Sequence, residues 1–209
     1  MTVPALTEPA APTVLIAGDT HMAFDHLVAA DRTTPPGVPI LHVGDLDYTP
    51  ASSETWRRFA RSLTRDVFFL RGNHDLVPMG WRDAAEPVRI SPQLYFVPDG
   101  TVLTIGGLRI GCVGGASSID RAVREPAGLW DPHEGLRPVE ELRAMTMGPV
   151  DLLVTHIPEQ ATVQRVSDPR MLAFFNLPPT WRDPVADVIT RVRTALGMPP
   201  IVSGHMHRA

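Results

Sequence analysis

The chain has 209 residues, of which 44% are hydrophobic and 20% charged, and its formal net charge is -4. This composition is typical of a folded globular protein and excludes a disordered, collagen-like or coiled-coil chain. The negative charge gives no basic footprint for nucleic acid and no cationic face for anionic lipid. We therefore expect no nucleic-acid partner. The apolar runs are far shorter than the about 20 residues of a membrane helix, so we also expect no membrane span.

All 19 basic residues are arginines. The absence of lysine excludes Schiff-base chemistry, anchoring of pyridoxal phosphate and a P-loop whose lysine reaches a phosphate. Any cationic side-chain contact to phosphate must therefore come from arginine. The one cysteine, Cys112, lies in an apolar run. We expect it to be a buried strand residue, because one thiol forms no internal disulfide and apolar burial raises its pKa.

Residues 1–12 are rich in proline and do not follow the pattern of a secretory signal. We expect a flexible tail there, one domain over residues 13–209 and a cytoplasmic location. Short apolar runs with the length and composition of strands follow along the chain. They are Thr13–Gly18, Val38–Val43, Asp66–Leu70, Leu94–Val97, Thr101–Ile105, Arg109–Val113, Asp151–Thr155 and Ile201–Ser203.

Two segments between these runs have the apolar period of an amphipathic helix, Glu54–Leu63 and Pro184–Leu196. Ser53 and Asp183 stand where N-cap residues belong. Between two of the predicted strands, Gly106-Gly107 supplies the positive φ angles of a tight β-hairpin turn. The pattern as a whole predicts an α/β fold with some antiparallel pairing.

Polar residues of the types that bind metals directly follow several predicted strands, where open α/β sheets gather their ligand sites. They form the groups Asp19-Thr20-His21, Gly44-Asp45, Arg71-Gly72-Asn73-His74-Asp75, Thr155-His156 and Gly204-His205-Met206-His207. Each group alone is ordinary for a turn or a hydrogen-bonded histidine, but that explanation would have to hold for every group. In D-x-H and H-x-H, extended backbone sends residues i and i+2 to the same side, so both can reach one ion.

This ordered set of motifs, D-x-H, G-D, G-N-H-D, a lone His and G-H-x-H, resembles the signature of the calcineurin-like metallophosphoesterase superfamily from Asp19 to His207. The resemblance implies a four-layer α/β sandwich, in which two mixed β-sheets are flanked by helices. It implies a hydrolase of phosphate esters, either a phosphomonoesterase or a phosphodiesterase. The alternative is a metal-binding scaffold of the same fold that has lost turnover, because fold resemblance alone does not establish function.

The resemblance also implies two divalent ions with Asp45 as the bridging ligand. One ion would be held by Asp19, His21, Asp45 and His207, and the other by Asp45, Asn73, His156 and His205. This donor set suits Mn or Fe foremost, with Zn or Ni as alternatives, better than the all-oxygen site of Ca. Two such ions carry more positive charge than Asp19 and Asp45 neutralise, and would attract phosphate. They would activate a water for in-line attack on phosphorus.

The resemblance places His74 beside the substrate, where it would protonate the leaving oxygen or stabilise charge on phosphorus. Arg71 belongs to an R-G-N-H block similar to that of protein phosphatases, where this arginine lies near the phosphate. The alternative is a surface arginine that closes the strand. Arg121 and Arg124 lie in a loop similar to one in some family members, and are either substrate clamps or solvated loop residues.

The chain departs from the family pattern after Asp45. The family often has G-D-x-x-D, with the last Asp orienting the catalytic His, but here Tyr48 takes that place and Asp47 stands one residue early. The remaining histidines match no block and are interpreted as structural; they are His26, His42 and His133. Substrate specificity is expected to lie in the loops Ala116–Pro132 and Pro158–Pro179, whose composition does not identify the substrate.

Overall fold

The computed structural model describes residues 14–49 and 52–207. Its strands are β1 (Leu15–Ala17), β2 (Ile40–His42), β3 (Val67–Phe69), β4 (Val88–Ser91), β5 (Leu94–Phe96), β6 (Thr101–Ile105), β7 (Leu108–Val113), β8 (Leu152–Thr155) and β9 (Ile201–Ser203). Its helices are α1 (Phe24–Thr33), α2 (Ser53–Ser62), α3 (Met79–Arg82), α4 (Arg121–Arg124), α5 (Pro138–Met145), α6 (Gln160–Val166), α7 (Pro169–Phe174) and α8 (Pro184–Ala195). No helix in this part of the chain has the length and apolar character needed to cross a membrane.

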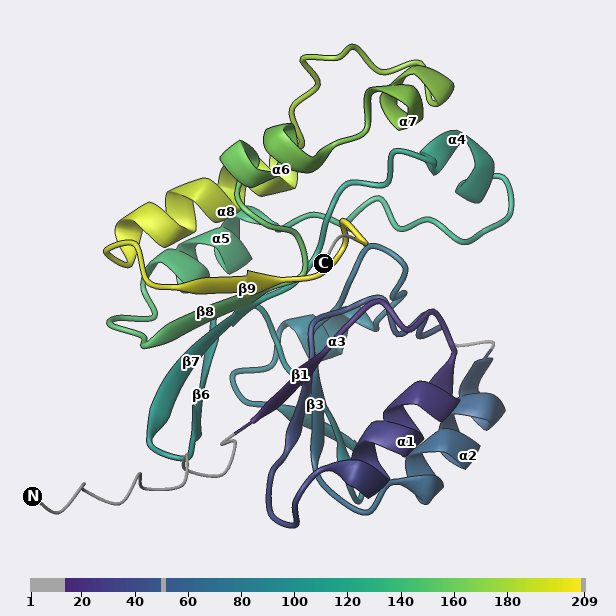
Figure 1. Cartoon of the computed structure of the whole chain (residues 1–209), viewed down its shortest axis with the longest axis vertical. Helices are drawn as coiled ribbons and strands as arrows, with labels where there is room; N and C mark the ends of the chain where they lie inside the picture. Colours follow the sequence, from purple (N-terminus) through teal and green to yellow (C-terminus); the bar gives the residue numbers. More distant parts are fainter. Residues whose placement is uncertain (1–13, 50–51, 208–209) are drawn as a thin grey trace, which may run out of the picture.

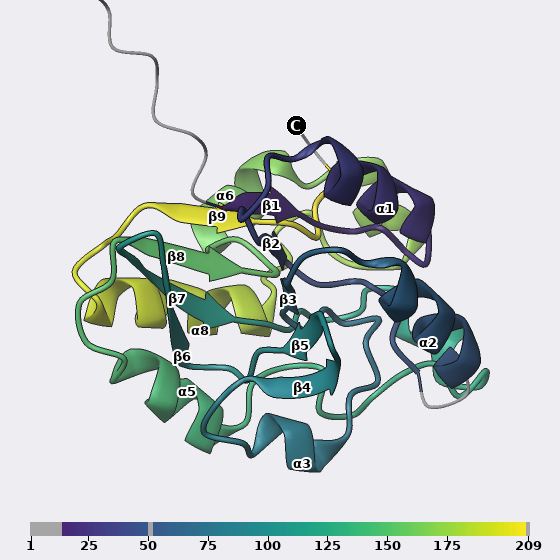
Figure 2. The same cartoon turned by 90° about the horizontal axis from the view of Figure 1, so that it is seen from below.

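The strands form two mixed sheets. The first has the order β1-β2-β3-β5-β4, in which only β4 runs antiparallel to its neighbour. The second has the order β6-β7-β8-β9, in which β6 and β7 are antiparallel and the other neighbours are parallel. Figures 1 and 2 show α1 and α2 beside the first sheet and α5 and α8 beside the second.

The described residues form three hydrophobic cores that hold these layers together. Both faces of each sheet can be packed, because successive side chains of a strand point to opposite faces. Leu41 of β2 packs in the core between the two sheets, whereas its neighbour Ile40 packs with Phe59 of α2. On the other side, Leu153 of β8 packs with Ile189 of α8. The expected arrangement of two mixed sheets flanked by helices is therefore confirmed.

The predicted strands are all present, with ends that differ by a residue or two, and Gly106 and Gly107 turn the hairpin at positive φ. Cys112 is buried in β7, as expected, and burial raises the pKa of its thiol. The expected tail over residues 1–12 lies outside the described residues. The sequence missed β4, a short edge strand between prolines, the residue type that weakens a strand prediction most.

The helices are the part of the fold that the sequence predicted least well. The two predicted helices are present as α2 and α8, but α1, α5 and the short helices were not predicted. Asp183 caps α8 as expected, accepting the N–H groups of Val185 and Ala186. Ser53 is not an N-cap, because α2 begins at this residue and Ser52 precedes it. The Oγ of Ser52 bonds to Thr49 instead of to the helix.

A buried ion-pair cluster joins the α3 side of the molecule to α5. Glu140 of α5 is 1% exposed and accepts bonds from Nε and Nη2 of Arg82 at 2.8 and 2.6 Å. The backbone N–H and Nη2 of Arg137 also donate to Glu140, both at 2.8 Å. Burial alone would raise the pKa of Glu140, but the bonds from the two arginines outweigh burial and lower the pKa to about 2.

We predict that Glu140→Gln lowers the free energy of unfolding by about 3–5 kcal/mol at pH 7, because it leaves buried guanidinium groups without a counter-charge. The folded pKa of Glu140 lies below its ordinary value, so its contribution is full above about pH 4.5 and is lost as the pH falls toward 2. Denaturant unfolding should show the wild type and the variant converging over that window. The matched control is Glu141→Gln, because Glu141 pairs with the exposed Arg191 and should contribute at most about 1 kcal/mol. A pH-independent difference for Glu140→Gln would contradict the prediction.

Candidate metal centre

The loops that follow β1, β2, β3, β8 and β9 meet at one end of the two sheets. These strands run parallel within their sheets, so their carboxyl ends face the same way. The first three loops carry Asp19, His21, Asp45 and Asn73, and the last two carry His156, His205 and His207. The structure therefore brings together all the side chains that the sequence suggested as ligands.

The carboxylate of Asp45 lies between two groups of imidazoles. Its Oδ2 is 3.7 Å from Nε2 of His21, and its Oδ1 is 3.4 Å from Nε2 of His156. On the His21 side, Nε2 of His207 is 3.4 Å from Nε2 of His21 and 3.7 Å from Oδ1 of Asp19. Each oxygen of Asp45 thus faces a separate set of nitrogen and oxygen donors.

The second set consists of Asp45, Asn73, His156 and His205. Oδ1 of Asn73 is 3.1 Å from Nε2 of His156, and the ligand atoms of Asp45, His156 and His205 lie within 4.8 Å of one another. Donors placed about 2.0–2.2 Å from one ion lie at most about 4.4 Å apart. The spacing of both sets therefore fits one divalent ion each, with small adjustments.

Hydrogen bonds behind the donors fix which atoms face the site. Nδ1 of His156 is 2.8 Å from the carbonyl oxygen of Val43, which only accepts, so Nδ1 donates a hydrogen bond there and Nε2 is the ring nitrogen that faces Asp45 and Asn73. Burial alone would lower the pKa of His156, but the charge of Asp45 and the bond to it raise that pKa to about 9. Nδ2 of Asn73 donates to Oγ of Ser118 at 3.0 Å, which turns its Oδ1 toward His156. Burial lowers the pKa of His205 to about 3, so its imidazole is neutral at pH 7. These side chains are arranged as metal ligands before an ion arrives.

Backbone strain is concentrated at the same loops. Residues other than glycine rarely adopt positive φ angles, and where they do the strain often marks a functional site. Among the described residues, the non-glycine residues with positive φ include Asp19, His21, Asp45, His205 and His207, at 52°, 44°, 58°, 68° and 47°. Met22 and Asp47 lie in the same loops, whereas Asn176 and Met198 lie elsewhere. The first five residues come from three separate loops, so one local turn preference does not explain the pattern.

Glycines next to the ligands allow the loops to approach one another. A Cβ on Gly72 would overlap Oδ1 and the backbone nitrogen of Asp45. A Cβ on Gly44 would lie 2.6 Å from Nδ1 of His156, and Gly44 has a φ of 105°. The G-D and G-N-H motifs therefore need glycine for contact between loops as well as for turning.

Comparison with known proteins agrees with this geometry. The family described as calcineurin-like phosphoesterase matches residues 12–209. The chain belongs to this family. No curated protein matches the sequence at a significant level. Among solved structures, a protein of unknown function from Aquifex aeolicus matches with 15% identity and a TM-score of 0.37, over 70% of this chain and 78% of that chain.

The buried carboxylate of Asp75 holds the loop that carries Asp45. It accepts the backbone N–H groups of Asp45, Tyr48 and Gly72 at 2.9, 2.8 and 2.7 Å. Burial and the nearby charge of Asp45 raise the pKa of Asp75 to about 6. Asp75 thus sets the distance between the loops after β2 and β3. The sequence showed Asp75 only as the end of a motif, and gave no signal for this role.

His74 lies at the rim of the candidate metal centre, with its side chain 30% exposed. Its backbone N–H donates to Oδ1 of Asp45 at 3.0 Å, and burial lowers the pKa of its imidazole. Oδ1 of Asp47 is 3.6 Å from Nδ1 of His74 and 3.1 Å from Nδ1 of His21. Asp47 therefore faces both histidines although it stands one residue early in the family pattern. The signal that could have found it is the second carboxylate in Gly44-Asp45-Leu46-Asp47.

The three arginines expected near the substrate are engaged elsewhere. Arg71 is buried, and its three guanidinium nitrogens donate to Asp99 and to the carbonyls of Glu134 and Gly135. The arginine of the R-G-N-H block is therefore buried and supports the loop after β3. Nothing in the structure turns it toward phosphate.

The other two arginines are the first and last residues of α4. Arg121 is exposed and pairs with Glu125. The Cζ of its guanidinium lies 3.8 Å from the ring centroid of Trp130. Arg124 is buried and donates to Ser118 and to the carbonyl of Asn73. Arg124 thus supports the ligand Asn73 from behind, and neither side chain lines the cavity beside the site.

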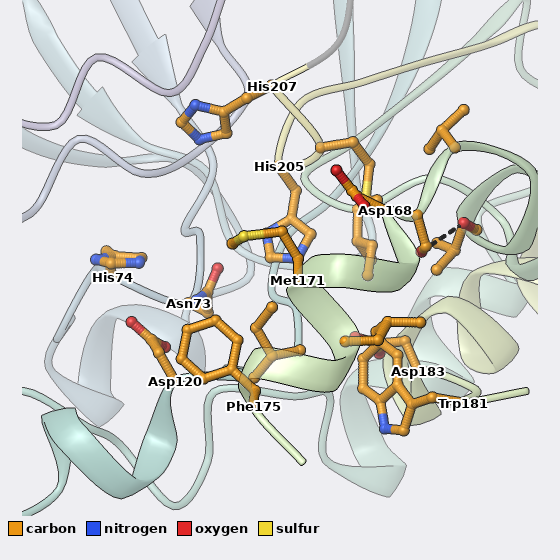
Figure 3. Close-up of a pocket in the computed structure, with 17 residues that line it drawn as sticks. Asn73, His74, Asp120, Asp168, Met171, Phe175, Trp181, Asp183, His205 and His207 are labelled. Carbon is orange, nitrogen blue, oxygen red and sulfur yellow. Dashed lines mark hydrogen bonds between the residues drawn. The ribbon is translucent and has the colours of Figure 1, made fainter. Parts of the chain in front are cut away.

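That cavity has a volume of about 400 Å³ and adjoins the loops that carry the candidate ligands (Figure 3). Asn73, His74, His205 and His207 form one wall. Parts of both segments expected to determine specificity, residues 116–132 and 158–179, form the others. These segments are loops, as the sequence suggested, but they also contain the short helices α4, α6 and α7.

We predict that Gly72→Ala reduces the affinity for divalent metal by about 10–100-fold, because the new Cβ displaces Asp45. Elemental analysis after dialysis against limiting metal measures this effect. The control is Gly80→Ala in α3, where a Cβ meets no atom within 4 Å and alanine is the better helix former. Full metal retention by Gly72→Ala would contradict the position of Asp45.

Proposed function

We propose that the protein is a dinuclear metal-dependent hydrolase of phosphate esters. Membership of the calcineurin-like phosphoesterase family supports metal-dependent phosphoester hydrolysis. The observation that carries the proposal is the position of Asp45, whose two oxygens face the two separate donor sets at 3.7 and 3.4 Å. A single structural ion would need only one of these sets.

In this proposal, Asp19, His21, Asp45 and His207 hold one ion, and Asp45, Asn73, His156 and His205 hold the other. The mixed donors favour Mn or Fe, with Zn or Ni as alternatives. When bound, two such ions supply an activated water and positive charge for the phosphoryl oxygens. Asp47 and the carbonyl of Val43 keep the imidazoles of His21 and His156 in orientation.

His74 is the group proposed to act on the leaving oxygen. Its side chain lines the cavity beside the ligands, and its backbone is tied to Asp45. Burial lowers the pKa of His74, and the charges of Asp45 and Asp47 oppose this shift by favouring the protonated imidazole. A protonated His74 can give its proton to the departing alcohol, which contributes about 10²–10⁴-fold in rate in comparable cases.

Hydrolysis of p-nitrophenyl phosphate and bis-p-nitrophenyl phosphate with added Mn²⁺ tests the proposal. We expect release of p-nitrophenol from at least one ester, abolished by EDTA and restored by metal. Their relative rates distinguish a monoesterase from a diesterase. A protein that binds two ions and cleaves neither ester would instead be the scaffold of the same fold.

We predict that Asp45→Ala removes both ions, because both donor sets lose a shared carboxylate. His21→Ala should leave about one ion per chain, because it removes a donor from one set only. Asp25→Ala, an exposed carboxylate in the first turn of α1, should keep the wild-type metal content. Metal analysis measures all three, and two ions retained by Asp45→Ala would disprove the bridge.

We predict that His74→Asn lowers kcat by about 10²–10⁴-fold with metal content unchanged, because a proton donor is lost while the ligands stay. The loss should be larger for an alkyl phosphate than for p-nitrophenyl phosphate, since a poor leaving group needs the proton more. An equal loss for both would make His74 a stabiliser of charge rather than an acid. His26→Asn, on the exposed side of α1, is the matched control.

A further inference from the structure

The cavity beside the metal ligands is larger than a phosphate needs. Its volume of about 400 Å³ lies within the range of about 300–1,000 Å³ found for sites of drug-sized molecules. In Figure 3, Asn73, His74 and His205 lie toward one end, Trp181 and Asp183 toward the other, and Met171 and Phe175 between them. The space therefore extends from the reacting end toward α6 and α7.

The wall away from the ligands is apolar. It is formed by side chains of α6, α7 and the neighbouring segments, namely Ile119, Ile157, Val163, Val166, Met171, Leu172, Phe175, Trp181 and Met206. Four of them, Ile157, Val163, Trp181 and Met206, also pack in the hydrophobic core beneath α5 and α8. That part of the wall is the surface of a packed core and is therefore preformed.

The charged groups of the cavity are all carboxylates or imidazoles, and no arginine is among the described residues that line it. Asp183 is occupied as the cap of α8, and Asp168 accepts from the N–H of Arg170 at the start of α7. Asp120 lies near His74 in the close-up and is 4.0 Å from Arg124. An additional anionic group on a ligand would meet negative charge and apolar surface here.

We propose that this cavity binds an uncharged, apolar organic group of the phosphate ester. The inference rests on the proposed hydrolase function and names its substrate class. Esters whose organic part carries further phosphates or carboxylates are selected against, because the described residues of the wall include no arginine and the wall removes the water of these groups. The apolar group contributes binding by burial against Met171, Phe175 and Trp181.

Binding of n-alkylphosphonates to the metal-loaded protein tests this directly, since their C–P bond is not hydrolysed. Calorimetric titration of the methyl, propyl and pentyl compounds should show affinity rising about two- to fourfold per methylene, as expected for partial to full burial of each group. 5-Carboxypentylphosphonate should bind at least about tenfold more weakly than pentylphosphonate. The phosphonate head is common to the series, so the differences report the cavity alone.

Two adjacent aromatic residues provide a variant and its control. Phe175 lines the cavity, whereas Phe174 is 76% exposed and does not. Phe175→Ala should reduce the gain per methylene, and Phe175→Arg should reverse the preference in favour of 5-carboxypentylphosphonate. Phe174→Ala should behave as the wild type. Melting temperature and metal content confirm that each variant folds.

The outcomes separate this inference from the proposed function. If all the phosphonates bind with equal affinity, the apolar subsite is disproved and the hydrolase proposal stands. If affinity rises with chain length but no phosphate ester is cleaved, the subsite stands and the hydrolase proposal is disproved. If no phosphonate binds to protein that holds two ions, both are disproved.

Discussion

The position of one buried carboxylate, Asp45, is the constraint on which the rest of the site depends. Leaving a carboxylate charge in a protein interior is costly unless partners surround it. Burial alone would raise the pKa of Asp45, but the charge of His156 and the bond to it outweigh burial and hold that pKa far below its usual range. The neighbouring loops must therefore come close, which explains the glycine at position 72 and the carboxylate of Asp75 that binds their N–H groups.

The same constraint fixes how the two sheets face each other. Asp45 follows a strand of the first sheet, whereas His156 and His205 follow strands of the second. The link between the sheets is direct, since Nδ1 of His156 bonds to the carbonyl of Val43 at 2.8 Å. The core between the sheets includes Val43 and Val154, close in sequence to Asp45 and His156. The packing of this core therefore also determines the positions of the candidate ligands. A change of side-chain volume in the core will move the imidazole of His156.

The sequence predicted what short-range patterns determine and failed where long-range contacts decide. The candidate ligands were found because polar residues follow apolar strands. Each of those strands was visible in the sequence as a run of apolar residues. Asp47 and Asp75 were not assigned their roles, because these depend on N–H groups and imidazoles from other loops. Arg71 was expected near phosphate, yet a buried acceptor, Asp99, follows another strand and no local pattern links the two. The helices around the cavity were missed because they are short and lean on tertiary packing.

The candidate ligands follow the ends of strands, whereas the apolar wall of the cavity comes largely from short helices, and this difference bears on specificity. The ligands are held by strained backbone, buried hydrogen bonds and close glycine contacts, so few substitutions there preserve the chemistry. The far wall of the cavity uses apolar side chains, such as Met171 and Phe175, that only need to fill space. A sequence reader sees these residues as ordinary core, because apolar residues that line a cavity and those that fill a core have the same pattern. If the proposed function holds, the choice of substrate depends on α6, α7 and the adjoining chain, while the reaction depends on the motifs.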